Sequence, residues 1–319
     1  MSRNFLHRFT KRFFLLGVLF ALIACTAAPT LTPTPIPPTP TPQGRTLLVT
    51  SPADSGPGTL RQALHEAQSG DTITFDPAIF PPDAPVTIFI ASELPHIRQG
   101  NLTIDASNAG VILDGRDATG DWLAGLQIVS SNANTIRGLQ ISNFSGPGIA
   151  ISGEAKNNVI GGERSVGAGP FGQGNLLINN DVGVVLSNPG TSLNTITGNF
   201  IGTDSEGANA LGNRIGIGIT ESANGNIIGP DNIIAYNDEF GIQVESSESL
   251  RNTITQNSIR DNAREDIELM EGGNIQLVAP LILNFDLTDG LVTGFSCANC
   301  TVEIFSDGDE RTIYEGRTE

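Results

Sequence analysis

From residue 134 to residue 270, short apolar runs alternate with asparagine and glycine, and this pattern repeats five times. Each repeat holds three runs of three to five residues, the last of the form Gly-Ile-x-Ile or a close variant. Runs this short and this rich in Ile and Val indicate β-strands rather than helices. Five asparagines mark the starts of the repeats: Asn134, Asn158, Asn194, Asn226 and Asn252.

The repeats start 24, 36, 32 and 26 residues apart, a size typical of solenoids, whose units bury their apolar faces only by stacking. Three short strands per turn predict an all-β fold, a right-handed parallel β-helix with three sheets. Strands at residues 86–90, 102–106, 111–115 and 125–129 add less regular coils ahead of the clear repeats. The solenoid is therefore expected to span residues 45–276.

Asparagine and glycine are expected at the corners, because those positions need left-handed or bridge backbone angles. Stacked asparagine side chains can also bond to one another and to the corner backbone. The last corner of each repeat predicts one such structural ladder, formed by Asn143, Asn180, Asp204, Asn237 and Asn262. Disorder of an Asn-rich chain is the alternative, which the interleaved isoleucines disfavour.

Residues 59–68 predict a short amphipathic helix that covers the open end of the stack. Leu60 and Leu64 share one helical face, and Thr59 and Gln62 have the spacing of a capping box. A solenoid needs such a cap, because its terminal coil otherwise exposes apolar core and unpaired strand edges.

After residue 276 the pattern changes to alternating apolar runs, which predict antiparallel strands. Residues 277–319 are therefore expected to form a partial β-sandwich-like module, too short to be a complete sandwich. Cys297 and Cys300 lie between two of these strands, and in an exported protein we expect them to form a local disulfide.

The first 25 residues carry four basic side chains and then an apolar run too short for a stop-transfer helix, which indicates a targeting signal. The run ends Leu22-Ile23-Ala24-Cys25, which resembles a bacterial lipobox and predicts lipid attachment at Cys25. An ordinary signal peptide with an incidental cysteine is the alternative. Residues 26–44 are rich in Pro and Thr and predict an extended tether, so the expected location is the cell envelope, outside the cytoplasm.

The net charge of the chain limits the partners that it can be expected to bind. Four of the 17 basic residues lie in the signal segment, which leaves 13 against 34 acidic residues, a formal net charge of −21 for the remainder. A chain this acidic is not expected to bind nucleic acid or an anionic surface.

Three stretches resemble those of a known family. Gly-Thr-Leu-Arg-Gln-Ala-Leu at 58–64, followed by Gly-Asp-Thr-Ile at 70–73, is similar to the start of many bacterial surface β-helices, and Gly-Asn-Phe-Ile-Gly-Thr-Asp at 198–204 is similar to their repeats. The chain thus resembles the pectate-lyase-like superfamily over about residues 45–276. This resemblance implies the β-helix fold but no single activity, because the superfamily includes polysaccharide lyases, glycoside hydrolases and adhesins.

The outward positions of the Gly-Ile-x-Ile strands hold no catalytic set. They are Ala150, Val185, Gly218, Gln243 and Glu268. An inverting hydrolase needs paired carboxylates, and a lyase needs a base beside a group that neutralises the uronate. If the protein is an enzyme, the residues to inspect lie in the early coils: Arg98, Asp105, Asp114, Arg116, Asp117 and Asp121.

Acidic residues gather in the last two repeats and could supply oxygen ligands for Ca²⁺. The candidate ligands are Asp238, Glu239, Glu265 and Asp266. They lack the spacing of a calcium loop, so a solvated acidic face is the favoured interpretation and no cofactor is expected. Two inserted loops, 161–173 and 205–214, are either further places for ligand contact or tolerated insertions.

These observations favour a lipid-anchored, extracytoplasmic β-helix that binds glycans or other surface partners without catalysis. The first alternative is a polysaccharide lyase or glycoside hydrolase acting on a uronate-rich polymer, and the second is a structural or adhesive stalk. Exposed aromatic side chains would favour a binder, but aromatic residues are scarce in this chain and Trp122 is its single Trp.

Overall fold

The computed structural model describes residues 44–278, 280–286, 291–296, 302–308 and 311–318. The predicted signal segment with Cys25, nearly all of the linker, and Cys297 and Cys300 lie outside the described residues. Within the described residues, the secondary structure contains no helix with the length and apolar character needed to cross a membrane.

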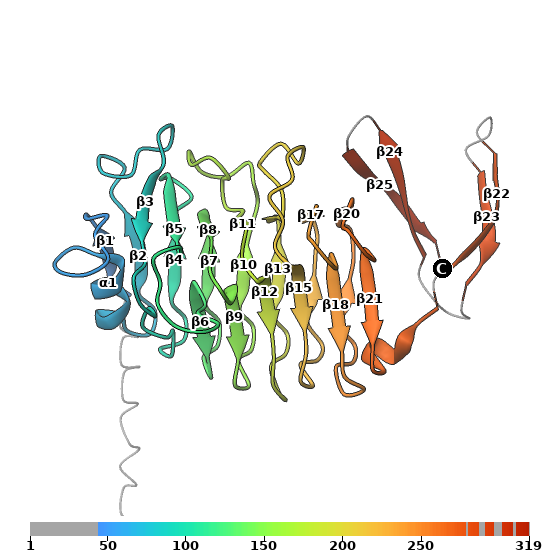
Figure 1. Cartoon of the computed structure of the whole chain (residues 1–319), viewed down its shortest axis with the longest axis horizontal. Coiled ribbons are helices and arrows are strands. Elements are labelled where there is room, and N and C mark those ends of the chain that lie inside the picture. Colours follow the sequence, from blue (N-terminus) through green and yellow to red (C-terminus); the bar gives the residue numbers. More distant parts are fainter. Residues whose placement is uncertain (1–43, 279, 287–290, 297–301, 309–310, 319) are drawn as a thin grey trace, which may run out of the picture. The chain divides into compact units, whose positions relative to one another are not determined.

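Three parallel sheets, A, B and C, form the solenoid, and each coil contributes one strand to each sheet over most of its length (Figure 1). Sheet A consists, in order, of β1 (Thr46–Val49), β2 (Thr72–Phe75), β4 (Thr103–Asp105), β7 (Thr135–Arg137), β10 (Val159–Gly161), β13 (Thr195–Thr197), β16 (Ile227–Ile228) and β19 (Thr253–Ile254). Sheet B consists of β3 (Val86–Phe89), β5 (Val111–Asp114), β8 (Leu139–Ser142), β11 (Leu176–Ile178), β14 (Phe200–Ile201), β17 (Ile233–Ala235) and β20 (Ser258–Arg260). Sheet C consists of β6 (Leu126–Val129), β9 (Pro147–Ser152), β12 (Val182–Leu186), β15 (Ile215–Ile219), β18 (Ile242–Glu245) and β21 (Ile267–Met270). The three-sheet parallel β-helix predicted from the sequence is confirmed.

The core is a set of in-register aliphatic rows. In sheet A, one fully buried isoleucine from each of six successive coils pairs with the next: Ile73, Ile104, Ile136, Ile160, Ile196 and Ile228. Alternation along each strand turns these side chains inward and their neighbours outward. The inward-facing isoleucines therefore account both for the repeat in the sequence and for the buried core of the solenoid.

Buried asparagines connect the coils at the corners, as Asn194 illustrates. Its backbone N–H and its Nδ2 both donate to Oδ1 of Asn226, at 3.1 and 2.9 Å, and Nδ2 also donates to the carbonyl of Ala155 at 3.0 Å. Its own Oδ1 accepts from the backbone N–H and the Nδ2 of Asn158 at 3.0 and 2.8 Å. One fully buried side chain thus pairs groups from three coils that would otherwise be unsatisfied.

Three such ladders run through the solenoid, one ahead of the strands of each sheet. The ladder of sheet A contains the five predicted repeat starts: Asn134, Asn158, Asn194, Asn226 and Asn252. The ladder of sheet B contains Asn175, Asn199, Asn232 and Asn257. The ladder of sheet C contains Asn180, Asn213, Asn237 and Asn262.

The sheet C ladder differs from the predicted set at two positions. Asn143 directs its Nδ2 to Asp114 at 3.0 Å instead, and the ladder begins where the backbone N–H of Phe144 donates to Asn180. In the structure the second inserted loop covers residues 204–212, so Asp204 lies on it, and the corner of that coil is delayed until Asn213, two residues before β15. The insertion, not the spacing from the preceding strand, decides which residue reaches the ladder.

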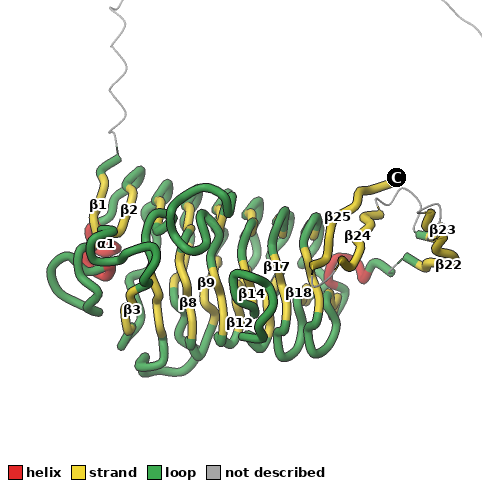
Figure 2. Tube along the Cα trace, turned by 90° about the horizontal axis from the view of Figure 1, so that it is seen from above, coloured by secondary structure: helices red, strands yellow, loops and turns green. Residues whose placement is uncertain are grey.

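The first coils carry the predicted helix, α1 (Leu60–Glu66), which contacts β1 and is drawn beside it in Figure 2. Its N-cap Thr59 accepts from the N–H of Gln62, and Oε1 of Gln62 accepts from the N–H of Gly58. The first bond satisfies a donor that the helix start leaves unpaired, and the second pairs the N–H of the residue before the N-cap. Arg45, ahead of β1, forms an ion pair with Asp71 at 2.6 Å, and this contact lowers the pKa of Asp71 to about 2.

Past the short 3₁₀ helix η1 (Gly273–Gln276), the chain forms two antiparallel hairpins, β22 (Leu281–Asp286) with β23 (Leu291–Phe295) and β24 (Val302–Gly308) with β25 (Arg311–Thr318). The carboxylate of Glu303 accepts from the hydroxyl of Thr255 and, at 2.9 Å, from the N–H of Gln256. The second hairpin therefore supplies hydrogen-bond partners to the two residues that follow β19, the last strand of sheet A.

Replacement of Asn194 by Ala should lower the free energy of unfolding by about 3 kcal/mol or more, because buried groups on the neighbouring coils lose their partners at about 1–3 kcal/mol each. The thermal and urea midpoints of the protein measure this loss. Asn209→Ala is the matched control, since Asn209 is exposed and bonds only within its loop. Equal midpoints for the two variants would contradict a stabilising role for the ladder.

Candidate functional site

Part of the outer face of sheet B, over β11, β14 and β17, is covered by the two inserted loops. Phe171 from the first loop and Leu211 from the second pack against outward side chains of β11, β14 and β17, and Phe171 meets Phe200 edge-on at 6.4 Å between ring centroids. These loops therefore close one face of the solenoid with their own apolar side chains.

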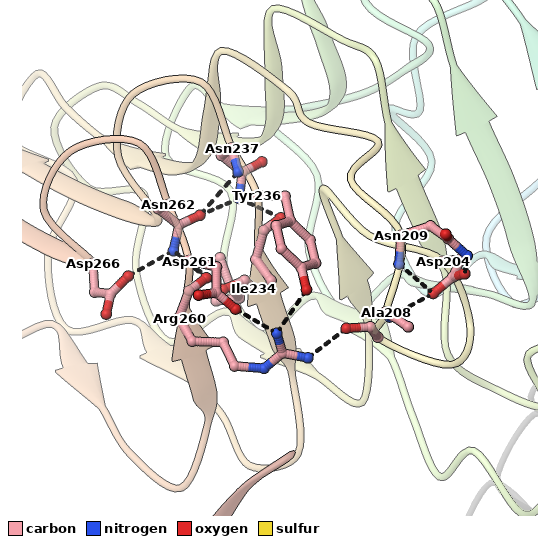
Figure 3. A network of polar contacts seen from close by, with 12 residues as sticks. Asp204, Ala208, Asn209, Ile234, Tyr236, Asn237, Arg260, Asp261, Asn262 and Asp266 are labelled. Carbon is pink, nitrogen blue, oxygen red and sulfur yellow. Dashed lines mark hydrogen bonds and ion pairs between the residues drawn. The ribbon is translucent and has the colours of Figure 1, made fainter. Parts of the chain in front are cut away.

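The second loop is held by Arg260 of β20 (Figure 3). Its guanidinium stacks on the ring of Tyr236 at 5.5 Å, donates to the hydroxyl of Tyr236 at 3.1 Å, and donates to the carbonyl of Gly207. Asp204 organises the loop from the other side, because its Oδ1 accepts from the N–H groups of Ala208 and Asn209 at 2.8 and 3.3 Å. Backbone and side-chain donors thus keep the pKa of Asp204 low despite partial burial.

The early-coil candidates do not converge. Asp105, on sheet A, pairs with Arg137 at 2.6 Å, whereas Asp114, at the end of a sheet B strand, pairs with Arg116 at 2.6 Å. Burial acts to raise the pKa of each carboxyl, but the bonds from its arginine and neighbouring donors outweigh it and lower the pKa of both.

The remaining early-coil candidates are exposed. Arg98 donates to Nδ1 of His96, whose Nε2 contacts Glu93 at 2.8 Å. Asp117 and Asp121 are exposed residues of the segment between β5 and β6.

Two of the four calcium candidates contact other side chains, and the other two are exposed. Glu239 lies between Arg214 at 3.3 Å and Arg264 at 4.0 Å, and Asp266 accepts from Nδ2 of Asn262 at 2.8 Å. Asp238 and Glu265 are exposed. In the part of the chain that the structure describes, no three acidic, histidine or cysteine side chains come together as a metal site.

A row of alternating charges follows the corner between sheets B and C, and we call it the charge row: Asp181, Arg214, Glu239 and Arg264. Its members lie on four successive coils, because the N–H of Glu239 donates to the carbonyl of Arg214 and the N–H of Arg264 donates to that of Glu239, both at 2.8 Å. Arg214 donates from Nε and Nη2 to the two oxygens of Asp181, at 2.7 and 3.0 Å. This forked pair lowers the pKa of Asp181 and raises that of Arg214.

Trp122 lies at the head of the charge row. Its Nε1 donates to Oδ2 of Asp181 at 3.3 Å, although the side chain is 57% exposed. Gly146 lies against the backbone of Trp122, and a Cβ there would come within 2.8 Å of the Trp122 carbonyl. The indole is therefore anchored through Nε1, while more than half of the residue surface is open to solvent.

Beside the charge row, several outward side chains of sheet C are apolar and largely buried against one another. Side chains of Val182, Ile215 and Phe240 form a second, exterior apolar cluster with Ala150 and Val185, and Arg264 stacks on Phe240 at 5.5 Å. The predicted outward row is in register across the coils, as Ala150, Val185, Gly218, Gln243 and Glu268. This side of the solenoid thus combines the exposed Trp122, the paired charges of the corner and an outward strand row that contains no cation.

Sequence reasoning did not find the charge row. Its members lie 33, 25 and 25 residues apart, because loops of different length intervene. The available signal was the asparagine ladder: Asp181 and Arg214 directly follow ladder residues, and Glu239 and Arg264 come two positions after theirs.

No protein-family model and no curated protein matches the chain. Among solved structures, the crystal structure of pectate lyase Pel9A is similar with a TM-score of 0.48 and 14% sequence identity, over 69% of this chain and 55% of that one. The chain thus spans about half the length of that enzyme.

Replacement of Asp181 by Asn should cost up to about 1 kcal/mol of stability at neutral pH, the range of partly exposed ion pairs. Because the folded state lowers the pKa of Asp181, its contribution is present above the ordinary carboxyl pKa and is lost as the pH falls through the lowered value. The stability difference between wild type and D181N should therefore vanish in acid, as urea unfolding at several pH values would measure. A difference independent of pH would contradict the ion-pair account, and the exposed Asp238→Asn serves as control.

Replacement of Arg260 by Met should release the loop at residues 204–212 while the coils stay folded, because the loop loses the donor to Gly207. We expect faster limited proteolysis within this loop and an unchanged far-UV circular dichroism spectrum. Arg264→Met, whose side chain is 59% exposed, is the matched control. Unchanged cleavage in R260M would show that the loop is held by its apolar contacts alone.

Proposed function

We propose that the protein is a non-catalytic binding module of the cell envelope, whose β-helix holds a linear glycan along the outer face of sheet C. The observation that carries the proposal is the exposed indole of Trp122 at the head of the charge row. An aromatic surface beside a few oriented polar groups is the usual composition of a ligand site. Since strands repeat at about 4.8 Å, each coil can offer one contact to a polymer that lies along the stack.

The ionisation of the carboxyl groups supports binding over catalysis. Among the residues that the structure describes, every carboxyl group with a shifted pKa has it lowered: Asp71, Glu93, Asp105, Asp114, Asp181 and Asp204. The acid of a glycoside hydrolase needs a raised pKa, so that it holds a proton near neutral pH. Carboxylates that stay ionised and bound to donors suit a structural or binding role.

The envelope location rests on the sequence. Cys25 would carry lipid, and the Pro/Thr-rich segment that follows would extend by roughly 3 Å per residue and hold the β-helix away from the bilayer. Metabolic labelling with a palmitate analogue would test the anchor, with Cys25→Ser as the control.

Incubation of the protein with a panel of neutral and uronate-containing polysaccharides, with and without Ca²⁺, tests the function. We expect no fall in viscosity and no new unsaturated or reducing ends, but slower migration in affinity electrophoresis with at least one glycan. Depolymerisation would contradict the non-catalytic proposal. Retention by no glycan would contradict binding and favour a stalk.

Trp122→Ala should lose most of the retention, because the apolar surface for the sugar ring is removed. Phe89→Ala is the matched control, since Phe89 is also an exposed aromatic residue, at 46%, but lies on sheet B. An equal loss of retention in both variants would show that glycan binding does not depend on the Trp122 face.

A further inference from the structure

We infer that the ligand of the Trp122 face is a neutral glycan and not a uronate polymer, an inference that rests on the proposed glycan binding. Three features of the face bear on the class of its ligand: the pairing of the cations beside Trp122, the charge of the rest of the face, and the polar groups that stay available. Each of these favours hydroxyl groups over carboxylates as the ligand's polar groups.

The central cation beside Trp122 is already neutralised. Arg214 gives Nε and Nη2 to Asp181 and Nη1 to Glu239, the last at 3.3 Å. Two of the five guanidinium N–H groups stay available, but a uronate carboxylate bonded to them would lie beside Asp181 and Glu239 as a third like charge. The charge row as a whole holds two acids and two bases, so it presents no net positive charge.

The neighbouring positions add amides and acids. None of the six strands of sheet C contains Lys or Arg, and their outward polar side chains include Gln127, Gln243, Glu245 and Glu268. Across the next corner, Asn188 donates to Glu221 at 2.6 Å. With a formal charge of −21 beyond the signal segment, the surface repels a polyanion both locally and at a distance.

Hydroxyl groups match what the charge row leaves exposed. A sugar hydroxyl both donates and accepts, so it can bond to a guanidinium N–H or a carboxylate oxygen without breaking the pair between them. The side chains of Arg214 and Arg264 are 44% and 59% exposed, and the carboxylates of the row, Asp181 and Glu239, are 24% and 29% exposed. The indole of Trp122 supplies the apolar surface for the ring.

The fluorescence of the protein reports directly on this face, because Trp122 is the single Trp of the chain. We would titrate the protein with neutral cello-, xylo- and manno-oligosaccharides and, separately, with oligogalacturonates. We expect a neutral ligand to change the Trp emission, with an affinity that varies less than about twofold between about 0.05 and 0.5 M NaCl. In affinity electrophoresis, Trp122→Ala should weaken that binding about tenfold or more.

A double variant, D181N with E239Q, tests the role of the pairing. It removes both carboxylates that neutralise Arg214 and should gain salt-sensitive binding of oligogalacturonates; circular dichroism would check that it is folded. Failure of the folded double variant to gain this binding would overturn the pairing argument. The single variant R214Q, which removes the cation, serves as its control.

The outcomes separate this inference from the proposed function. Salt-sensitive binding of oligogalacturonates by the native protein, lost in R214Q, would overturn the neutral class and leave glycan binding standing. Binding of a neutral glycan with unchanged Trp emission would overturn the location of the site. Binding of no glycan from either class would overturn the proposed function itself.

Discussion

The fold depends on one requirement: each coil must turn its corners without leaving backbone amides unpaired in the interior. At a corner the chain leaves the sheet, so hydrogen bonds between parallel strands no longer pair its backbone N–H and C=O groups. The buried asparagines replace it with a side-chain ladder, in which Asn213, for example, bonds to Asn180 and Asn237 and reaches back to the carbonyl of Leu177 at 3.0 Å. Because each member both donates and accepts, a ladder is satisfied only while it is continuous.

Continuity of the ladders also positions the surface. A residue that directly follows a ladder asparagine is held beside its counterpart in the next coil, whatever the length of the loop between them. Asp181 and Arg214 are 33 residues apart in the chain, yet form a forked ion pair. The interior ladder therefore sets the geometry of the exposed charges, and through Asp181 it sets the position of Trp122.

The sequence predicted the three sheets, the helix and the inward isoleucines because they follow from periodicity and from residue chemistry. It did not predict which asparagine completes the sheet C ladder, because that depends on how a loop returns to the coil. Counting back from the Gly-Ile strand would have selected Asn213, three residues before Gly216, as Asn180 stands three before Gly183. The charge row was missed for the same reason, since its alignment exists only after the coils are stacked.

The alternation of sign along the charge row constrains how such a solenoid can change its length. Duplication of one of these coils would place two like charges in adjacent coils, where neighbouring corner residues are joined by backbone hydrogen bonds of 2.8 Å. Duplication of two adjacent coils would keep every acid beside a base. The exterior charges therefore favour lengthening of the solenoid by an even number of coils. The asparagine ladder of the interior would accept a single added coil.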